Sequence, residues 1–369
     1  MTPPLPRTAR EVRLVSAPQG LPTPADFAVT EAPLPAPGPG QVLIRNRYFL
    51  VFPGLRTLIG GEVDGVPLPA LSSGDALFGP AVGEVVAAGD GSSLRPGDTV
   101  THLQGWRDHA VVDAAHCTPV GDTLPDPVAH LSQGSSAYGA LTRLAPVRTG
   151  DTVLVTGAAG AVGTLAGPVA RLLGAGRVIG TTRSPGKAGR LAAEFGYDAV
   201  LLAGPQAPFA APGPQAPFAA PGPQAPFAAP GPQAPFAAQL AEAAPDGIDV
   251  LLDTVGGEQL AAAVGAARQR ARFALVGALS GQLSARRAGG SAPVEIDSFR
   301  IVVKGLSLRG YSGTDHPGLE EEWNGRFGAW LRSGEITFPH TRIPGIDRAP
   351  QALQELIEGR HFGAVVVEL

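Results

Sequence analysis

Two kinds of hydrophobic pattern divide the chain. Residues 10–125 hold short apolar runs of β type, at 41–51, 81–88 and 110–113, separated by turns rich in glycine and proline. Such runs predict a compact, mostly β domain. Beyond about residue 126, short apolar strands alternate with amphipathic helices. That alternation predicts a parallel, doubly wound sheet.

The predicted elements of the second part follow one another in regular order. Strands are expected at residues 151–155, 177–180, 198–202, 248–252, 272–276 and 306–309, and helices at 162–173 and 187–195. A helix at 351–358 and a strand at 364–368 make the C-terminal stretch β-rich again. We therefore predict an α/β protein with a Rossmann sheet at 127–336 and a β-rich domain formed by 1–126 together with 337–369.

A nonapeptide repeat interrupts the Rossmann part. From Gly204 the sequence Gly-Pro-Gln-Ala-Pro-Phe-Ala-Ala-Pro recurs, with restarts at Gly213, Gly222 and Gly231. Proline lacks a backbone donor and disrupts helix interiors and central strands. We expect residues 204–238 to be an irregular surface insertion that the fold and catalysis do not need. The alternative is that the four repeat phenylalanines cap the adenosine side of a cofactor site.

Composition narrows the classes of function. Lys plus Arg is 28 against 32 for Asp plus Glu, so the net charge of −4 argues against nucleic acid or an anionic membrane as a partner. No run of eighteen apolar residues occurs and the Pro-rich start lacks a signal-peptide core, so we expect a cytoplasmic protein. Cys117 is the single cysteine, and the seven histidines lack partners at zinc spacing, so we expect no metal site.

The first strand-to-helix turn of the Rossmann part is the strongest candidate for chemistry. Residues 156–163 read Thr-Gly-Ala-Ala-Gly-Ala-Val-Gly and connect an apolar strand directly to a helix. Glycines at such spacing permit a tight turn, close approach of a pyrophosphate and close packing of helix on strand. The helix N-terminus adds free N–H groups and a favourable dipole. The sequence therefore predicts a dinucleotide site.

The end of the second strand indicates which dinucleotide binds. Folds that prefer NAD place a carboxylate there to hold the ribose 2′-hydroxyl. Residues 180–187 read Gly-Thr-Thr-Arg-Ser-Pro-Gly-Lys, with no carboxylate, two cations and three hydroxyls. One of only two lysines in the chain, Lys187, lies here. This composition suits a 2′-phosphate and favours NADPH as the cofactor.

These motifs resemble the zinc-independent medium-chain dehydrogenase/reductases, nearest to the branch of prostaglandin, leukotriene, curcumin and 2-alkenal reductases. The resemblance rests on residues 152–163, 184–187, 247–258 and 277–280 and, nearer the N-terminus, on 20–27, 40–43, 95–98 and 105–106. It covers nearly the whole chain outside the repeats. It implies a GroES-like β domain packed on a Rossmann domain, with NADPH between them delivering hydride to the β-carbon of an α,β-unsaturated carbonyl.

Carried over position by position, the resemblance assigns a cofactor site. The pyrophosphate would be held by Gly160, Ala161, Val162 and Gly163, and the 2′-phosphate by Ser184 and Lys187 with help from Arg183. The nicotinamide side would be lined by Thr254, Gly277, Ala278, Leu279, Ser280, Tyr311 and Ser312. In two departures, Ala203 stands where the family has a tyrosine over the adenosine, and His361 where it has an asparagine.

The substrate side departs further from the family. Residues 50–56 read Leu-Val-Phe-Pro-Gly-Leu-Arg in place of Ser-Val-Asp-Pro-Tyr-Met-Arg, so an acid and a tyrosine are absent. Leu-Ser-Gln replaces Gly-Met-Pro at 131–133. The residues expected to face the substrate are Ser132, Gln133, Tyr48 and Tyr138. We expect a bulky, functionalised natural product of polyketide type rather than a simple alkenal.

The implied reaction is NADPH-dependent reduction of an activated C=C bond, with hydrogen-bond donors stabilising the developing enolate. No catalytic acid is assigned; the candidate donors are Tyr48, Tyr138, Tyr311 and Gln133. One alternative is a reductive cyclase, in which hydride addition to a polyene macrolactam closes a ring. Another alternative is a nucleotide-binding protein without catalytic activity. The negative net charge argues against RNA as the ligand of such a protein. We expect a homodimer.

Overall fold

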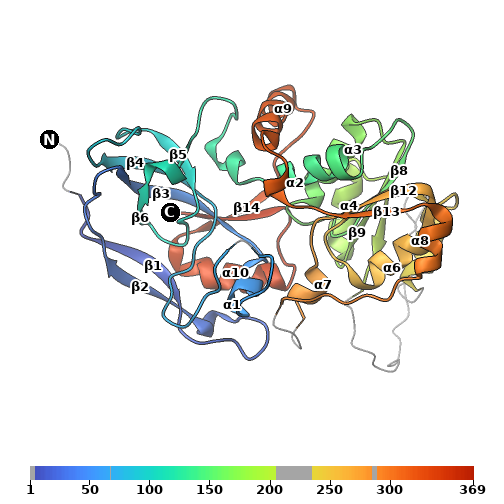
Figure 1. The fold of residues 1–369 in the computed structure, drawn as a ribbon, viewed down its shortest axis with the longest axis horizontal. Helices are drawn as coiled ribbons and strands as arrows, with labels where there is room; N and C mark the ends of the chain where they lie inside the picture. The colour runs from blue at the N-terminus through green and yellow to red at the C-terminus, as the bar shows by residue number, and fades with distance from the viewer. Residues whose placement is uncertain (1–4, 67, 205–234, 285–288) are drawn as a thin grey trace.

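The computed structural model describes residues 5–66, 68–204, 235–284 and 289–369. Its strands form two large sheets that lie side by side along the long axis of the molecule (Figure 1). One sheet has seven strands and belongs to the β-rich part, on the left of the figure. The other has six strands and belongs to the α/β part, on the right. The expected combination of a GroES-like domain and a Rossmann domain is confirmed.

The β-rich part is built around the long strand β3 (Gln41–Val51), whose bounds match the predicted strand. Its sheet follows the order β14-β15-β3-β4-β5-β7, and β6 also pairs with β3. These strands are β4 (Ala81–Ala88), β5 (Thr99–His102), β6 (His109–Asp113), β7 (Thr118–Pro119), β14 (His340–Pro344) and β15 (Ala364–Glu368). A separate hairpin-like pair, β1 (Thr8–Leu14) and β2 (Phe27–Pro33), packs beside them with the short helix α1 (Leu55–Ile59).

The C-terminal segment returns to the β-rich part, as the sequence suggested. Helix α10 (Ala349–Ile357) packs on that core, and β15 pairs antiparallel with β3. The C-terminal residues thereby complete the first sheet after the chain has passed through the second.

The α/β sheet has the order β10-β9-β8-β11-β12-β13, and every pairing in it is parallel. Its strands are β8 (Thr152–Val155), β9 (Arg177–Thr182), β10 (Ala199–Leu202), β11 (Ile248–Asp253), β12 (Ala267–Leu275) and β13 (Ser307–Gly310). Its helices are α2 (Gly134–Gly139), α3 (Gly163–Leu172), α4 (Pro185–Glu194), α5 (Phe236–Ala243), α6 (Gly257–Ala266), α7 (Leu279–Gln282), α8 (Ser298–Lys304) and α9 (Leu319–Ser333).

Successive residues of the central strand β8 enter different cores. Val153 and Val155 pack with residues of α3 and α9, whereas Leu154 packs with residues of α5 and α6. Because helices cover both faces of the sheet, its strands read as continuous apolar runs rather than as alternating ones. This explains why the strand at 151–155 could be predicted without any polar alternation.

The repeat insertion gives one correction. Residues 205–234 lie outside the described residues, but the last three residues of the predicted insertion begin helix α5. Pro235 occupies the N-cap, where its missing N–H costs no helical hydrogen bond. Phe236 is buried in the core beside Leu201 and Ala203. The expectation of an irregular insertion through residue 238 is therefore wrong for residues 236–238.

Two further contacts fix the β-rich part against the α/β part. The Thr57 hydroxyl of α1 donates to the Gly289 carbonyl (3.0 Å), and the Gln282 side chain of α7 donates to Thr57 (3.3 Å). A small apolar cluster around Leu50, Leu131 and Val366 also contacts Ala161 of the nucleotide turn. These contacts hold the strand ends of the α/β sheet against the first domain.

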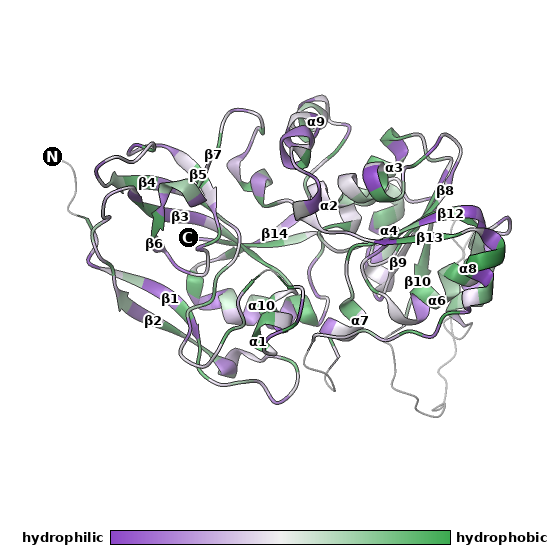
Figure 2. Ribbon diagram, viewed as in Figure 1, coloured by the Kyte–Doolittle hydropathy of each residue, from purple (hydrophilic) through white to green (hydrophobic). Residues whose placement is uncertain are grey.

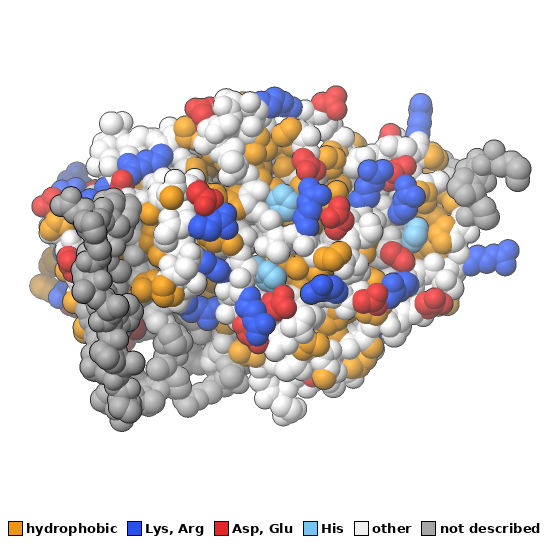
Figure 3. Space-filling view, turned by 180° about the vertical axis from the view of Figure 1, so that it is seen from behind, with side chains coloured by type: hydrophobic (Ala, Val, Ile, Leu, Met, Phe, Trp, Pro, Cys, Tyr) orange, Lys and Arg blue, Asp and Glu red, His pale blue; other side chains and the backbone are white. Residues whose placement is uncertain are grey.

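Polar and apolar side chains are mixed over the surface. Figure 3 shows Lys and Arg side chains interspersed with Asp and Glu on the rear face. At the right-hand end, α8 is largely green in Figure 2, and two of its residues, Phe299 and Val302, are 71% and 76% exposed. Among the described residues, no helix combines the length and apolar character that crossing a bilayer requires.

Candidate functional site: a dinucleotide turn crossed by the C-terminal segment

The turn between β8 and α3 is held in place by the neighbouring strand β9. The Gly157 N–H donates to the Thr181 hydroxyl (3.0 Å), and the Ala158 N–H donates to the Thr181 carbonyl (2.8 Å). The Thr181 hydroxyl in turn donates to Gln259 (2.7 Å). From the sequence, Thr181 is expected only to contribute one of the three hydroxyls near the 2′-phosphate. The structure shows that it anchors the turn.

The three glycines of the turn are needed for different reasons. At Gly163 an added β-carbon would lie 2.5 Å from the Ala158 α-carbon, so packing of the helix on the turn excludes a side chain. Gly157 has φ +64°, and its β-carbon would lie 2.5 Å from the Thr254 hydroxyl. At Gly160 the nearest protein atom would be the Gly157 carbonyl, at 3.3 Å, and φ is not positive. Neither clash nor backbone therefore excludes a side chain at Gly160, which leaves space for a ligand there.

Backbone donors point out of the same turn. Among the described residues, no acceptor is found for the N–H groups of Val162 and Gly163 at the start of α3. Unpaired donors at the N-terminus of a ten-residue helix are what a phosphate needs. The residues present fit the pyrophosphate of a dinucleotide.

A buried carboxylate fixes the end of the adjacent strand β11. Asp253 accepts from the Thr156 hydroxyl (2.6 Å) and from the N–H groups of Val255 and Gly256 (3.0 Å each). Burial raises the pKa of Asp253, and these hydrogen bonds oppose that shift. Asp253 was not among the predicted site residues. Its place after a buried strand and before two glycines was the only signal of its role.

The residues expected on the nicotinamide side come together at the ends of β11, β12 and β13. Thr254 donates its hydroxyl to the Thr156 carbonyl (2.8 Å), which ties β11 to β8. The Leu279 N–H donates to the Thr254 carbonyl (3.1 Å) and the Ser280 N–H to the Val255 carbonyl (2.9 Å), so the segment 277–280 packs on the segment 254–255. Thr254 therefore links the start of the turn after β8 to the segment 277–280.

Tyr311 and Ser312 follow directly after β13. The Tyr311 N–H donates to the Leu275 carbonyl at the end of β12 (2.9 Å), and its hydroxyl shares a hydrogen bond with Ser136 of α2. Burial raises the pKa of Tyr311, and the Ser136 hydrogen bond opposes the shift. A tyrosine whose pKa is raised stays neutral near pH 7 and keeps its O–H as a donor.

The predicted 2′-phosphate residues contact the C-terminal segment 357–363, here called the crossing segment. Lys187 donates to the carbonyls of Gly359 (2.6 Å) and His361, and Arg183 donates to the Ile357 carbonyl (3.4 Å). Burial, followed by the nearby Arg183, lowers the pKa of Lys187. Ser184 is the N-cap of α4 and lies beside them.

The crossing segment also reaches the nucleotide turn itself. The Gly363 N–H donates to the Ala159 carbonyl (3.0 Å), and Gly363 forms a bridge with Gly160. The Phe362 ring lies 5.2 Å from the Phe195 ring. The structure thus brings the turn, the two predicted phosphate-binding cations and His361 into one place.

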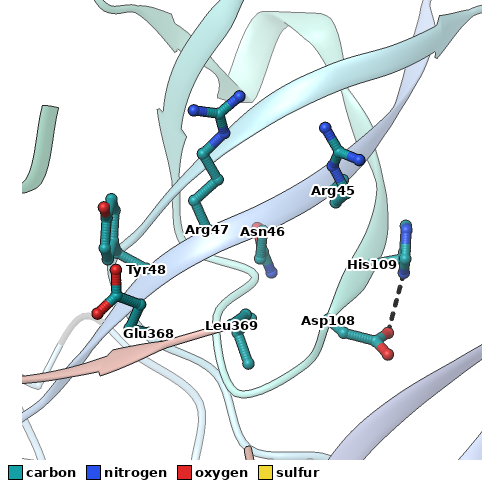
Figure 4. Close-up of a pocket in the computed structure, with 8 residues that line it drawn as sticks. All are labelled: Arg45, Asn46, Arg47, Tyr48, Asp108, His109, Glu368 and Leu369. Atoms are coloured by element: carbon teal, nitrogen blue, oxygen red, sulfur yellow. Dashed lines mark hydrogen bonds and ion pairs between the residues drawn. The ribbon is translucent and has the colours of Figure 1, made fainter. Parts of the chain in front are cut away.

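The residues predicted to face the substrate are more scattered. Tyr48 lines an open cavity of about 410 Å³ on the β-rich part, shown in Figure 4, which is formed by residues of β3, β6, β15 and adjoining turns. Its ring lies 5.4 Å from the Arg342 guanidinium. The cavity includes no residue of the nucleotide turn, so it is separate from the predicted cofactor site.

The Tyr138 side chain contacts other side chains of the protein core. Its side chain is buried, its hydroxyl donates to Glu322 Oε1 (2.5 Å), and its ring lies 5.9 Å from that of Trp323. These contacts do not favour the predicted role towards a substrate. Ser132 accepts from the Trp323 indole (3.4 Å), whereas Gln133 is the half-buried N-cap of α2.

Phe52, which stands where the family has an acid, is accommodated by two glycines. A β-carbon at Gly54 would lie 2.9 Å from the Phe52 ring, and one at Gly79 would lie 2.8 Å from it. The loss of the family tyrosine at position 54 and the gain of an aromatic ring at position 52 are therefore coupled by packing.

The part of the chain that the structure describes contains no cluster of three or more His, Cys, Asp or Glu side chains placed to hold a metal ion. The one cysteine, Cys117, is half-buried, and burial raises the pKa of its thiol to about 11.

Known proteins resemble the chain along its length. Residues 10–120 match the family described as "N-terminal domain of oxidoreductase", and residues 231–367 match "Zinc-binding dehydrogenase". The NADPH-dependent curcumin reductase of Escherichia coli is 26% identical over 96% of this chain and 95% of that protein. Prostaglandin reductase 1 of Bos taurus is 27% identical over 95% of each.

A solved structure supports the same relationship. The crystal structure of CurA in complex with NADPH from Vibrio vulnificus has 26% sequence identity and a TM-score of 0.79, over 97% of this chain and 98% of that one. Both parts of the fold are therefore shared with a protein of similar length. The chain belongs to the quinone-oxidoreductase-like medium-chain dehydrogenase/reductases, in the branch that contains the curcumin, prostaglandin and 2-alkenal reductases.

Proposed function

We propose that the protein is an NADPH-dependent reductase of the activated C=C bond of α,β-unsaturated carbonyl compounds. The observation that carries this proposal is that one segment, 357–363, contacts both the cations Arg183 and Lys187 and the turn whose Val162 and Gly163 N–H groups have no acceptor among the described residues. The named activities of the relatives, which include a curcumin reductase and a 2-alkenal reductase, point to the same chemistry.

The chain's residues divide the work of the reaction. Bound NADPH supplies a hydride to the β-carbon of the substrate. The N–H groups at the start of α3 hold the pyrophosphate, and Lys187, Arg183 and Ser184 bind the 2′-phosphate. The segments at 277–280 and 311–312 position the nicotinamide end. Neutral hydrogen-bond donors there, Tyr311 foremost, stabilise the enolate oxygen as charge develops, and the α-carbon takes a proton from solvent or from such a donor.

The substrate we propose is a bulky, functionalised natural product of polyketide type. Support comes from the region 48–56, where Phe52 fills the space beside Gly54 and Gly79. A second observation is the polar pair Ser132 and Gln133 before α2. An aromatic wall and added polar groups favour a ligand with both apolar surface and several oxygens.

A direct assay tests this function. Purified protein is mixed with NADPH and a panel of enones of increasing size, and oxidation of NADPH is followed by absorbance while the products are identified by NMR. We expect saturated carbonyl products, with kcat/KM rising for the larger polyoxygenated enones. NMR also separates simple reduction from ring closure. Failure of every enone to be reduced, with NADPH bound, contradicts the proposal.

The same assay tests whether the activity depends on a metal ion. Because none of the described residues forms a metal cluster, exhaustive chelation should leave the turnover rate unchanged. Stoichiometric zinc in the purified protein, with activity lost on its removal, would contradict a metal-independent mechanism.

We also propose that the protein is a homodimer through the exposed face of α8. This face presents Phe299, Val302 and Val303, and α8 leads directly into β13, the edge strand of the α/β sheet. Exposed apolar side chains next to an open sheet edge are features that association buries. Phe299→Arg should convert the dimer to a monomer in light scattering, and a monomeric wild-type protein would contradict the proposal.

A further inference from the structure

The crossing segment gathers an unusual set of charges at the proposed 2′-phosphate site. His361 Nε2 lies 3.1 Å from Glu355 Oε2 of α10, and the His361 side chain is only 12% exposed. The carbonyl of the same residue accepts from Lys187 of α4. The imidazole and the phosphate-binding lysine are thus joined through one residue.

The other charged groups around His361 leave the site short of negative charge. Arg183 lies on the same side as Lys187 and donates to the Ile357 carbonyl. Arg360 is paired with Glu358, and Arg190 stacks on Phe362 and pairs with Glu194. Glu355 is therefore the one carboxylate among these described groups that faces the imidazole without a guanidinium partner of its own.

We propose that His361, paired with Glu355, acts as a proton-linked specificity residue, which takes up one proton from solvent when the 2′-phosphate of NADPH binds beside Lys187. This inference rests on the proposed use of NADPH. It concerns what this chain has at the position of a family asparagine, which cannot be protonated.

The direction of the linkage follows from electrostatics. Before a phosphate binds, burial lowers the pKa of His361, with Lys187 and Arg360 adding to the effect and Glu355 opposing it. A dianionic phosphate beside this group favours its charged form, and the positive charge of the imidazolium offsets the repulsion between the phosphate and Glu355. The pKa of His361 therefore rises on binding. NADPH affinity should be highest at low pH and decrease as pH rises through the pKa of the bound state.

Lys187 sharpens this response because it is already held in place. Two of its three N–H donors go to the carbonyls of Gly359 and His361, so a phosphate can take the third without reordering the side chain. A phosphate that binds Lys187 therefore also lies near His361. NADH has no 2′-phosphate and should produce no such proton uptake.

Calorimetry on the wild-type protein tests the proposal. NADPH and NADH are each titrated at pH 7.5 in two buffers of different ionisation enthalpy, which gives the number of protons bound per ligand. The 2′-phosphate is itself almost fully dianionic at that pH, so its own titration contributes little. We expect uptake approaching about one proton with NADPH and none with NADH, and an NADPH affinity that falls up to about tenfold per pH unit above pH 7.

Two variants locate the proton. In His361→Asn the uptake should vanish and NADPH should bind several-fold more weakly, because Glu355 then repels the phosphate unshielded. Adding Glu355→Gln to His361→Asn should restore most of the affinity without restoring the pH dependence. NADH affinity and the melting temperature serve as controls for folding.

The outcomes separate the two proposals. Unchanged proton uptake in His361→Asn, or equal uptake with NADPH and NADH, would overturn the role of His361 while leaving an NADPH-dependent enzyme. If NADPH shows no preference over NADH at any pH, the cofactor choice itself fails.

Discussion

The nucleotide side and the substrate side of this protein are built in different ways. The predicted nucleotide side consists mostly of backbone groups at the ends of neighbouring parallel strands, and Gly157, Gly160 and Gly163 lie in the turn where the motif predicts them. On the substrate side, the predicted residues are side chains from distant segments. Of these, Tyr48 lines a separate cavity and Tyr138 is bonded to Glu322.

The difference shows what a local sequence can specify. A turn between a strand and a helix fixes its own backbone within eight residues, so a glycine pattern nearly determines the geometry. A side chain such as Tyr138 faces whatever tertiary neighbour reaches it, here Trp323 and Glu322 of α9. The geometry of a local backbone turn can therefore be predicted from the sequence more reliably than the contacts of a side chain.

The largest effect is expected from Gly163→Ala, which is compared with the same substitution at Gly160. Gly163→Ala places a β-carbon 2.5 Å from the Ala158 backbone. We therefore expect the free energy of unfolding to decrease by about 3 kcal/mol and NADPH binding to be lost. Chemical denaturation followed by fluorescence measures the first effect, and calorimetry measures the second.

Gly160→Ala is the matched partner of that variant. Its β-carbon approaches only the Gly157 carbonyl, at 3.3 Å, so stability should change by less than about 1 kcal/mol. NADPH should nevertheless bind at least about tenfold more weakly, since the methyl group occupies space for the pyrophosphate. Equal loss of stability in the two variants would show that the turn is not a ligand cradle.

A pair of tyrosine variants sharpens the comparison on the substrate side. Tyr311→Phe removes the hydroxyl that bonds Ser136 and that we propose as the donor to the enolate, and we expect kcat to fall roughly 100-fold with NADPH affinity little changed. Tyr138→Phe should keep kcat within about twofold, because its hydroxyl bonds Glu322, and should cost about 1 kcal/mol of stability. Steady-state kinetics distinguishes them; the reverse order of effects would restore Tyr138 as a substrate residue.

The smallest effect is expected from shortening the repeats. Deletion of residues 213–230 removes two copies and keeps Pro235 and the buried Phe236 that begin α5. Closure entropy depends only weakly on loop length, so the melting temperature should stay the same or rise slightly. NADPH affinity should also be unchanged. A marked loss of affinity at unchanged stability would instead make the repeats part of the cofactor site.

Much of the fold was predictable from the pattern of apolar residues. The strand at 41–51 was placed to the residue, and the strands and helices of the first βαβα unit were placed to within about two residues. Helix α9 was not predicted, because its sequence is mostly polar and only Trp323 and Phe327 bury large rings. The prolines of the repeat conceal the start of α5 in the sequence, because proline disrupts the interior of a helix but is well tolerated at its N-terminus.

The site was predictable where its residues lie close together in sequence. Lys187 and Arg183 are predicted from the sequence to bind the 2′-phosphate because they follow a predicted strand that lacks a carboxylate, and this role stays a prediction. The contacts of Lys187 with Gly359 and His361, and of Arg183 with Ile357, join residues about 170 positions apart, and no local pattern encodes such contacts. The anchoring roles of Thr181 and Asp253 were likewise hidden, because they depend on which strands become neighbours in the sheet.

The comparison of NADPH with NADH in one titration tests the central claim most directly. Calorimetry should show NADPH binding far more tightly than NADH, and Lys187→Ala should reduce NADPH affinity by about 1–3 kcal/mol while leaving NADH affinity unchanged. Lys304→Ala is the matched control, because it removes the only other lysine, whose ammonium bonds the Gly265 and Ala267 carbonyls far along the sequence from the turn. Equal affinity for the two cofactors, or equal losses in the two lysine variants, would contradict an NADPH site at the nucleotide turn.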